Sequence, residues 1–321
     1  MKKFLLLINF ICFLSSFSAQ LGINEFNCKR GFIDENGDDV DWIEIYNYSN
    51  NTILLSDFYL SDNQNNLDKW QFPAINLGSQ ELITICASGR ENTKFPNHWE
   101  ALVIPENNWK YWLGTSAPPN DWKLPGFNDQ TWDTGQGGIG YGDNDDNTII
   151  SSVPSLFLRK EFQVLDLNDI TQLLFHADYD DGFIAYLNGV EIMRSNNFNN
   201  FYPYYNELTN ANHEAVLYNG GIPDHIFFNT EDIQELLVTG SNLLAIQVHN
   251  ASANSSDMTS NFFLSAGIAS TNVSYQPLPN WIIPPVVYVH TDYKLSYGET
   301  IVISDFNENI IDSVLIPNDI T

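Results

Sequence analysis

The chain has few basic residues: 13 lysines and arginines stand against 40 aspartates and glutamates in 321 residues. Its formal net charge is therefore −27 at pH 7. A surface this negative repels the phosphates of nucleic acids and of anionic lipids. We therefore expect no nucleic-acid partner. The same excess of carboxylates can supply oxygen ligands for divalent cations wherever several of them converge.

Cysteine is scarce as well, with three in the whole chain. One of them, Cys12, lies in the opening MKKFLLLINFICFLSSFSAQ, whose basic start, short apolar run and small residues are typical of a secretory signal peptide. We predict that residues 1–19 are this signal and that the protein is secreted or displayed at the cell surface. We expect no membrane span, because this run is too short to cross a bilayer and no later one is longer. Cys28 and Cys86 remain, either as one disulfide or, since Cys86 lies in the apolar run ELITICA, as free thiols.

Helix signals are nearly absent. One short helix is expected within Thr230–Gly240, with Thr230 as N-cap and Gly240 as C-cap. Elsewhere the chain consists of short β-branched and aromatic runs separated by Asn, Asp, Gly and Pro. This pattern predicts an all-β protein built from sandwiches.

Common catalytic motifs are also missing. The six histidines are scattered, with no HExxH pair, and no Gly-x-Ser-x-Gly elbow occurs. Asp180 and Asp181 are adjacent in YDDGFIAYLNGVEIMR, so their side chains should point apart. Two-carboxylate glycosidases instead hold their acids about 5 to 10 Å apart across the scissile bond. We therefore assign no catalytic residue and predict that this chain is not an enzyme.

The first predicted domain spans residues 20–104. Its strand candidates are DWIEIYN, ILLSDFYLSD, KWQFP and ELITICAS, which suit a small immunoglobulin-like sandwich. Together with INEF and DENGDD, these stretches resemble the bacterial lamin-tail domain. The resemblance implies an immunoglobulin-like fold and an adhesive or accessory role, and it implies no catalytic residues.

The second predicted domain spans residues 105–270. Its strand candidates include LFLRKEFQV, QLLFHADY and NLLAIQVHN. In the last of these Leu244, Ile246 and Val248 alternate with Ala245, Gln247 and His249, which predicts a strand with one buried face. The stretches WLGTSAPPNDW, GIGYGDNDDNT, FLRKEF, YDDGFIAYLNGVEIMR and NLLAIQVHNASANSSDM resemble the galactose-binding-like jelly rolls of secreted bacterial enzymes and surface proteins. The resemblance implies a jelly-roll sandwich and, often, carbohydrate binding.

The remaining residues, 271–321, begin with the Pro-rich linker YQPLPNWIIPP. Two strands joined by a turn at Asn307–Asn309 follow, and they look like part of a second lamin-tail-type unit. An open hairpin is not stable alone, so we expect a fragment of a longer protein. In the arrangements that this chain resembles, such modules precede a spore-coat kinase-like domain or another surface domain.

The stretch YDDGFIAYLNGVEIMR predicts a β-hairpin. Asn188-Gly189 is a preferred type I′ turn, because both residues tolerate positive φ. One aspartate of the pair is expected to bond backbone amides in the preceding turn. The rim of a sugar site is the alternative, because exposed aromatic faces beside polar groups bind sugars. Candidate ligand-binding residues are Asp180, Asp181, Arg194, Tyr202, Tyr204, Tyr205 and His249.

Calcium is the cofactor that the acidic loops could hold, since it takes six to eight oxygen ligands. The candidate ligands are Asp34, Asn36 and Asp38 in DENGDDVD, Asp143, Asp145 and Asp146 in GDNDDN, and Asp178 in ADYDDG. The first loop resembles the start of an EF-hand but has Ile45 where the twelfth-position Glu would stand. Solvated turns are the alternative for all three loops.

These observations predict secreted, non-catalytic modules that bind a polysaccharide or another extracellular polymer and target a further domain of the same chain. Two alternatives stay open. The chain is the accessory part of a larger surface enzyme, such as a hydrolase or a spore-coat kinase-like protein, or it is a purely structural spacer.

Overall fold

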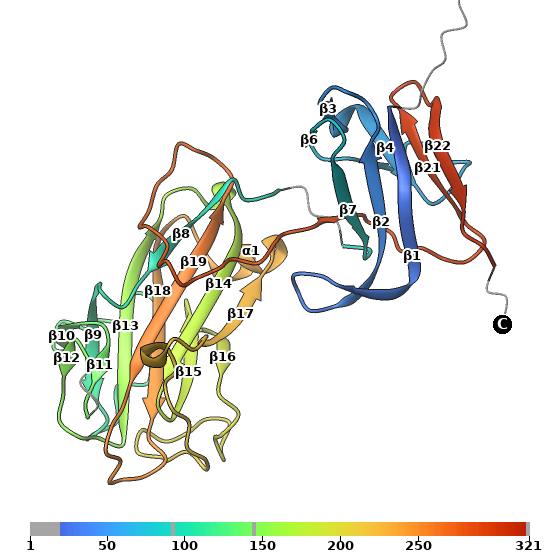
Figure 1. Cartoon of the computed structure of the whole chain (residues 1–321). Helices are drawn as coiled ribbons and strands as arrows, with labels where there is room; N and C mark the ends of the chain where they lie inside the picture. The colour runs from blue at the N-terminus through green and yellow to red at the C-terminus, as the bar shows by residue number, and fades with distance from the viewer. Residues whose placement is uncertain (1–19, 91–93, 143–145, 319–321) are drawn as a thin grey trace, which may run out of the picture. The chain divides into compact units, whose positions relative to one another are not determined.

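The computed structural model describes residues 20–90, 94–142 and 146–318. The chain is all-β, as predicted, and its one α-helix in the described part is α1 (Thr230–Leu236). It divides into two compact units, one formed by residues up to 93 together with 288–321 and the other by residues 94–287 (Figure 1). The predicted signal peptide lies outside the described residues. Among the described residues, no helix is long and apolar enough to cross a membrane.

The first unit contains two four-stranded sheets. One has the order β1-β2-β7-β20 and the other β22-β21-β4-β5. Their bounds are β1 (Leu21–Ile33), β2 (Asp39–Asn47), β4 (Phe58–Ser61), β5 (Trp70–Gln71), β7 (Leu82–Ala87), β20 (Val289–His290), β21 (Thr300–Asp305) and β22 (Ile310–Leu315). The short strands β3 (Ile53–Leu54) and β6 (Asn76–Leu77) pair separately. Cys28 and Cys86 are free thiols, which answers the question that the sequence left open.

The division differs from the predicted boundaries. The strands at 300–305 and 310–315 do not begin a second unit of their own but belong to the first (Figure 1). β21 pairs with β4, and β20 lies parallel to β7. Both pairings complete sheets of the first unit, because β4 and β7 would otherwise present free edges. The second unit is thus inserted between two parts of the first.

The second unit is a sandwich of a six-stranded sheet, β10-β9-β13-β18-β15-β16, and a four-stranded sheet, β17-β14-β19-β8. Their bounds are β8 (His98–Val103), β9 (Asn108–Leu113), β10 (Asp133–Gln136), β13 (Ser155–Val164), β14 (Ile170–Tyr179), β15 (Gly182–Leu187), β16 (Val190–Arg194), β17 (Asp224–Phe228), β18 (Gly240–His249) and β19 (Ser260–Ile268). A parallel pair, β11 (Ile139–Gly140) and β12 (Thr148–Ile149), lies beside them. Strand β8, assigned from sequence to the first domain, pairs with β19 here.

Alternation along the strands explains the core of this second unit. Leu244, Ile246 and Val248 of β18 face the other sheet and join one large apolar cluster, as predicted. Phe183 and Leu187 of β15 belong to the same cluster. The intervening side chains, such as Ala245 of β18 and Tyr186 of β15, point to the outer face of the six-stranded sheet, where they belong to a separate apolar cluster.

The hairpin is confirmed. Strands β15 and β16 pair with Leu187 opposite Val190, and the turn residues Asn188 and Gly189 have φ of 50° and 89°. The helix differs from expectation at both ends. Asn229 is its N-cap, accepting from two backbone amides, and the helix ends at Leu236, while Gly240 opens β18.

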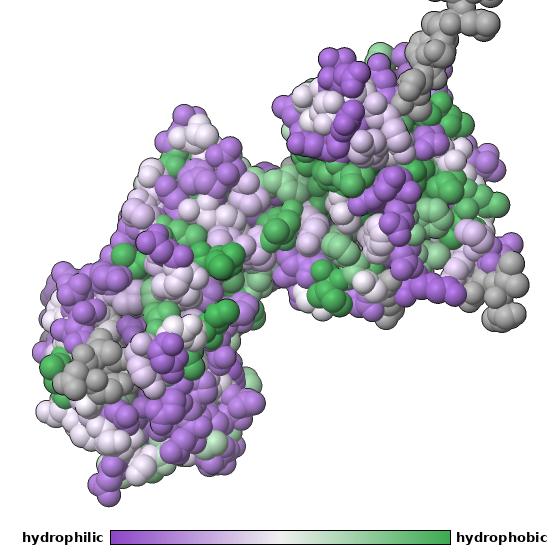
Figure 2. Space-filling view, in the orientation of Figure 1, coloured by the Kyte–Doolittle hydropathy of each residue, from purple (hydrophilic) through white to green (hydrophobic). Residues whose placement is uncertain are grey.

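The view in Figure 2 shows hydrophilic residues over much of the visible surface, broken by smaller hydrophobic patches. This agrees with a chain that carries 40 acidic residues.

Candidate functional site

The outer face of the six-stranded sheet carries a second apolar cluster. Phe157 of β13, Tyr186 of β15 and Ala245 of β18 contribute to it, and two loops cover it. Loop 115–132 adds Trp122 and Trp132, whose rings stack 6.4 Å apart. Loop 195–207 adds the partly buried side chains of Phe198 and Tyr205. The two loops do not cover the whole face, so openings remain between them.

Two neighbouring hollows occupy these openings, with volumes of about 370 and 550 Å³. We call them together the tyrosine recess. Both are lined by Lys123, Tyr186 and Tyr202. The smaller hollow is also lined by Ala117, Pro118, Asn120, Trp122, Phe157, Pro203, Tyr204, Tyr205 and Gln247, and the larger by Gly189, Glu191, Ile192, Met193, Arg194 and Phe201.

Exposure divides the aromatic rings of the recess into a floor and a rim. Tyr186 and Trp122 are 4% and 7% exposed, whereas Tyr202 and Tyr204 are 75% and 74% exposed. Burial and the nearby Glu191 charge raise the pKa of Tyr186 to about 12, so its hydroxyl stays protonated at neutral pH. Gln247 donates to that hydroxyl at 3.3 Å. The recess thus combines a fixed polar floor with exposed rings at its rim.

Arg159 of β13 holds the first loop. Its side chain is fully buried, its Nε lies 2.9 Å from an oxygen of Asp129, and its Nη1 donates to the carbonyls of Trp122 and Leu124. Its guanidinium also lies 5.1 Å from the centre of the Phe127 ring. A planar group with several fixed donors can tie a loop to a sheet in this way. The loop that presents Lys123 is therefore anchored through the strand beneath it.

Glu207 holds the second loop. Its carboxylate accepts from the side-chain amide of Asn200 at 2.9 Å and from the backbone of Tyr204 at 3.2 Å. Arg194 forms a two-pronged ion pair with Glu191, at 2.5 and 2.6 Å, and lies 4.3 Å from the centre of the Phe201 ring. The exposed tyrosines therefore lie on a loop that is closed by its own hydrogen bonds.

The sequence-predicted candidates separate into two groups. Tyr202, Tyr204, Tyr205 and Arg194 all line the recess, so the structure brings these four together. Sequence reasoning missed the residues from the facing loop and sheet, of which Lys123 is the most important. The stretch APPNDWK has the polar and aromatic character of a binding loop, but nothing in it shows that it faces the tyrosines.

His249 does not line the recess. It is 0% exposed, its Nδ1 donates to the carbonyl of Glu207 at 2.7 Å, and its Nε2 has no hydrogen-bond partner among the described residues. Burial lowers the pKa of His249 to about 4. The rings of Phe157 and Phe198 lie edge-on against it. This imidazole packs beneath the loop and cannot touch a ligand there.

Asp180 and Asp181 are also buried, at 4% and 3% exposure. Asp181 accepts hydrogen bonds from the backbone amides of His213, at 2.9 Å, and Ala251, at 2.6 Å. It therefore ties two distant loops to the start of β15 rather than capping the preceding turn. The expectation that the two side chains point apart is wrong, because the carboxyl of Asp180 lies close enough to that of Asp181 to interact with it.

The Asp180 carboxylate faces other acids. Its oxygen lies within 4.8 Å of ligand atoms of Glu214 and Asp257, a group that we call the Asp180 cluster. Burial, followed by the charge of Asp181, raises the pKa of Asp180 to about 9. A carboxyl in this environment requires either a proton or a cation.

Of the predicted calcium ligands of the second unit, Asp178 and Asp146 lie in the described part of the chain, and neither belongs to the Asp180 cluster. Asp178 accepts from the backbone amides of Val216 and Leu217 at 2.7 and 3.2 Å, so its carboxylate anchors a loop. Asp143 and Asp145 lie outside the described residues. Asp146 is described, close to Gly140.

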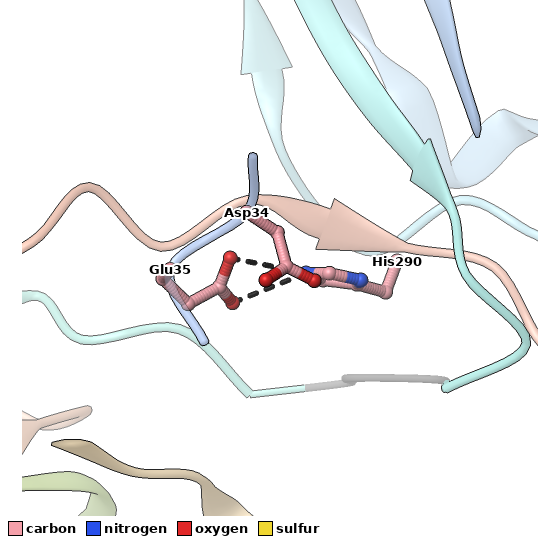
Figure 3. A group of neighbouring side chains, drawn as sticks. All are labelled: Asp34, Glu35 and His290. Atoms are coloured by element: carbon pink, nitrogen blue, oxygen red, sulfur yellow. Dashed lines mark hydrogen bonds and ion pairs between the residues drawn. The ribbon is translucent and has the colours of Figure 1, made fainter. Parts of the chain in front are cut away.

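The loop at Asp34–Asp38 is occupied by a protein cation. One oxygen of Asp34 accepts from the backbone of Asn36 and Asp38, at 2.9 and 3.0 Å, while Arg90 pairs with the carboxylates of both Asp34 and Asp38. The neighbouring Glu35 directs its carboxylate to His290 of β20, at 3.1 Å (Figure 3). These pairs join the C-terminal segment to the rest of the first unit. Asp34, Glu35 and His290 also offer ligand atoms that lie within 4.8 Å of one another, so calcium at this loop stays a prediction.

The sequence matches no known protein family, and it matches no curated protein at a significant level. Parts of solved structures are similar to it. A Bacteroides uniformis β-glucuronidase is 13% identical with a TM-score of 0.34, over 53% of this chain and 18% of the enzyme. A Bacteroides vulgatus β-glycosidase is 11% identical, TM-score 0.31, over 52% and 20%. A Bifidobacterium dentium β-glucuronidase is 17% identical, TM-score 0.30, over 50% and 21%. The matched part spans about a fifth of each enzyme, and similarity this low assigns no function to the chain.

Proposed function

We propose that the second unit is a non-catalytic carbohydrate-binding module whose site is the tyrosine recess. The observation that carries this proposal is the pairing of exposed rings, Tyr202 and Tyr204, with the polar side chains of Asn120, Lys123 and Gln247 in one hollow. Sugar CH groups stack on aromatic faces while amides and ammonium groups bond the hydroxyls. A rigid sheet beneath the hollow keeps the site preformed, which limits the entropy lost on binding.

A glycan array on the intact chain tests the proposal. Tyr202→Ala and Tyr204→Ala each remove one exposed ring, and we expect about tenfold weaker binding from each, the usual scale for one aromatic contact. Tyr218→Ala is the matched control, because Tyr218 is 65% exposed and does not line the recess. If no glycan is bound, or if the control weakens binding equally, the proposal fails.

We propose further that the Asp180 cluster holds a calcium ion. Asp180 is 4% exposed, and the side chains that act on its carboxyl are all acidic: Asp181, Asp257 and Glu214. A hard cation with oxygen ligands would neutralise this group. The role would be structural, because Asp181 beside it fixes two loops of the same unit.

Thermal unfolding with calcium or with chelator tests this site. Saturating calcium should raise the melting temperature by several degrees, since ligand at about a hundred times its Kd adds about 2.7 kcal/mol of stability. Glu214→Gln should reduce the shift, and this variant should fold because Glu214 is exposed. Glu231→Gln, at an exposed acid on α1, is the control. An identical melting temperature in calcium and in chelator would show that the Asp180 cluster does not bind calcium.

The first unit and its C-terminal strands fit a spacing or adhesive role beside the binding module, as the lamin-tail resemblance implies. We propose that the protein is exported and that the recess targets a larger assembly, in which a catalytic domain would be carried by another part of the same protein. Sequencing the gene on both sides of this segment, and locating the protein in culture supernatant or cell envelope, tests both points.

A further inference from the structure

The tyrosine recess contains one cation, Lys123, that has no counterion among the residues that the structure describes. Lys123 is half-buried, lines both hollows, and lies with Nζ 4.1 Å from the centre of the Tyr186 ring. It forms no ion pair with any described residue. A chain with 40 acidic and 13 basic residues offers many carboxylates, so an unpaired ammonium in a hollow is unexpected.

Charge at the recess has the opposite sign to that of the whole protein. The charged residues that line the two hollows are Lys123, Glu191 and Arg194. Glu191 and Arg194 neutralise each other through their two-pronged pair. The lining therefore carries a net charge of +1, although the chain as a whole carries −27.

Stacking on Tyr186 satisfies only one side of the ammonium. The ring attracts the cation through its negative face, but an ammonium has three N–H donors, and a ring occupies one direction. Lys123 lines the same hollow as the exposed rings of Tyr202 and Tyr204, which would hold a sugar, so its other donors are available to a ligand there. Lys123 is therefore placed to pair with an anionic substituent of a stacked sugar ring.

We infer that the recess selects glycans that carry an acidic sugar, with the carboxylate or sulfate group of that sugar bonded to Lys123. This inference rests on the proposed carbohydrate-binding function and adds the chemical class of the ligand. The overall charge of −27 repels a dense polyanion at long range, so the fitting ligand has acidic sugars spaced among neutral ones.

The test uses the intact chain and an array of paired oligosaccharides. Each uronate-bearing oligosaccharide is printed beside its carboxyl-reduced form, and each sulfated one beside its desulfated form, so the members of a pair differ only in charge. We expect the wild type to bind the acidic member roughly fivefold more tightly, as for a partly exposed ion pair. Preference within the uronate pairs or within the sulfate pairs then identifies the anion.

Lys123→Gln should abolish this preference while retaining binding to the neutral members, because the aromatic contacts remain. Lys110→Gln is the matched control: it removes one positive charge from β9 outside both hollows, and the preference should persist. Equal binding within every pair by the wild type overturns the inference and leaves carbohydrate binding intact. Loss of neutral and acidic binding together in Lys123→Gln also overturns it, since the lysine would then only position Tyr186. Absence of binding to any oligosaccharide instead refutes the carbohydrate-binding function itself.

Discussion

Acid sensitivity of the second unit should depend on His249. Its Nδ1 proton is donated to the Glu207 carbonyl, and among the described residues its buried Nε2 has no hydrogen-bond partner that could accept a second proton. Burial lowers the pKa of His249 from 6.5 to about 4. Between these values the unfolded chain binds more protons at this position than the folded chain. The contribution of His249 to the free energy of unfolding is therefore fully present above pH 6.5, and it is lost as the pH falls toward 4.

The magnitude follows from the two pKa values. At pH 4.5 the difference amounts to about 2.5 kcal/mol, against almost nothing at pH 7.5. Urea unfolding at both pH values, for the wild type and for His249→Gln, measures it. The variant has no imidazole to protonate, so its loss of stability between the two pH values should be smaller by about that amount.

The control changes an exposed residue that has no titratable group: Gln163→Asn on β13 should leave the pH difference as in the wild type. Burial also lowers the pKa of His176 to about 4, so some acid sensitivity should persist in His249→Gln. If the His249→Gln variant loses as much stability as the wild type, a buried neutral imidazole at this position is not a source of the acid sensitivity.

Three further outcomes follow from particular contacts. Gly182→Ala places a methyl group 2.5 Å from Cγ2 of Thr209, so it should lower the free energy of unfolding by about 1 to 3 kcal/mol, and an unchanged urea midpoint would contradict this packing. Arg159→Lys cannot form the same set of bonds to loop 115–132, so it should weaken glycan binding although Arg159 lines neither hollow; unaltered affinity would show that the loop needs no such anchor. Burial raises the pKa of the Cys86 thiol to about 12, so iodoacetamide at pH 8 should label it only after unfolding, as mass spectrometry can show; rapid labelling of the folded chain would refute its burial.

Several features were readable from neighbouring residues alone. The hairpin of β15 and β16 depends on the Asn188-Gly189 turn between two short apolar runs, which is local in the sequence. The face of β18 that packs on the other sheet follows from a period of two, but the opposite face, with Ala245, Gln247 and His249, is buried as well. The all-β class follows from short β-branched runs and missing helix signals. These inferences succeeded because each depends on residues within about ten positions of one another.

The division of the chain between the two units could not be predicted from neighbouring residues. Strand β20 pairs with β7, and β21 with β4, across roughly two hundred residues or more of intervening chain. A free strand edge can pair with any compatible strand, so the sequence of the edge strand does not predict which partner pairs with it. The predicted boundaries at residues 104 and 271 differ from the two units for two reasons: β8 pairs with β19 of the second unit, and the last strands of the chain pair with strands of the first.

The candidate site likewise combines features that the sequence predicts with features that only the folded structure shows. Sequence by itself determined that a tyrosine-rich loop follows the hairpin, and it identified Tyr202, Tyr204, Tyr205 and Arg194 as candidates. Only the tertiary structure decided that loop 115–132 faces this loop, that Lys123 lies over Tyr186, and that His249 is enclosed beneath loop 195–207. Side-chain chemistry is set by residue type, but burial, pairing and charge depend on what the folded chain brings beside each group, and those neighbours here come from segments far apart in the sequence.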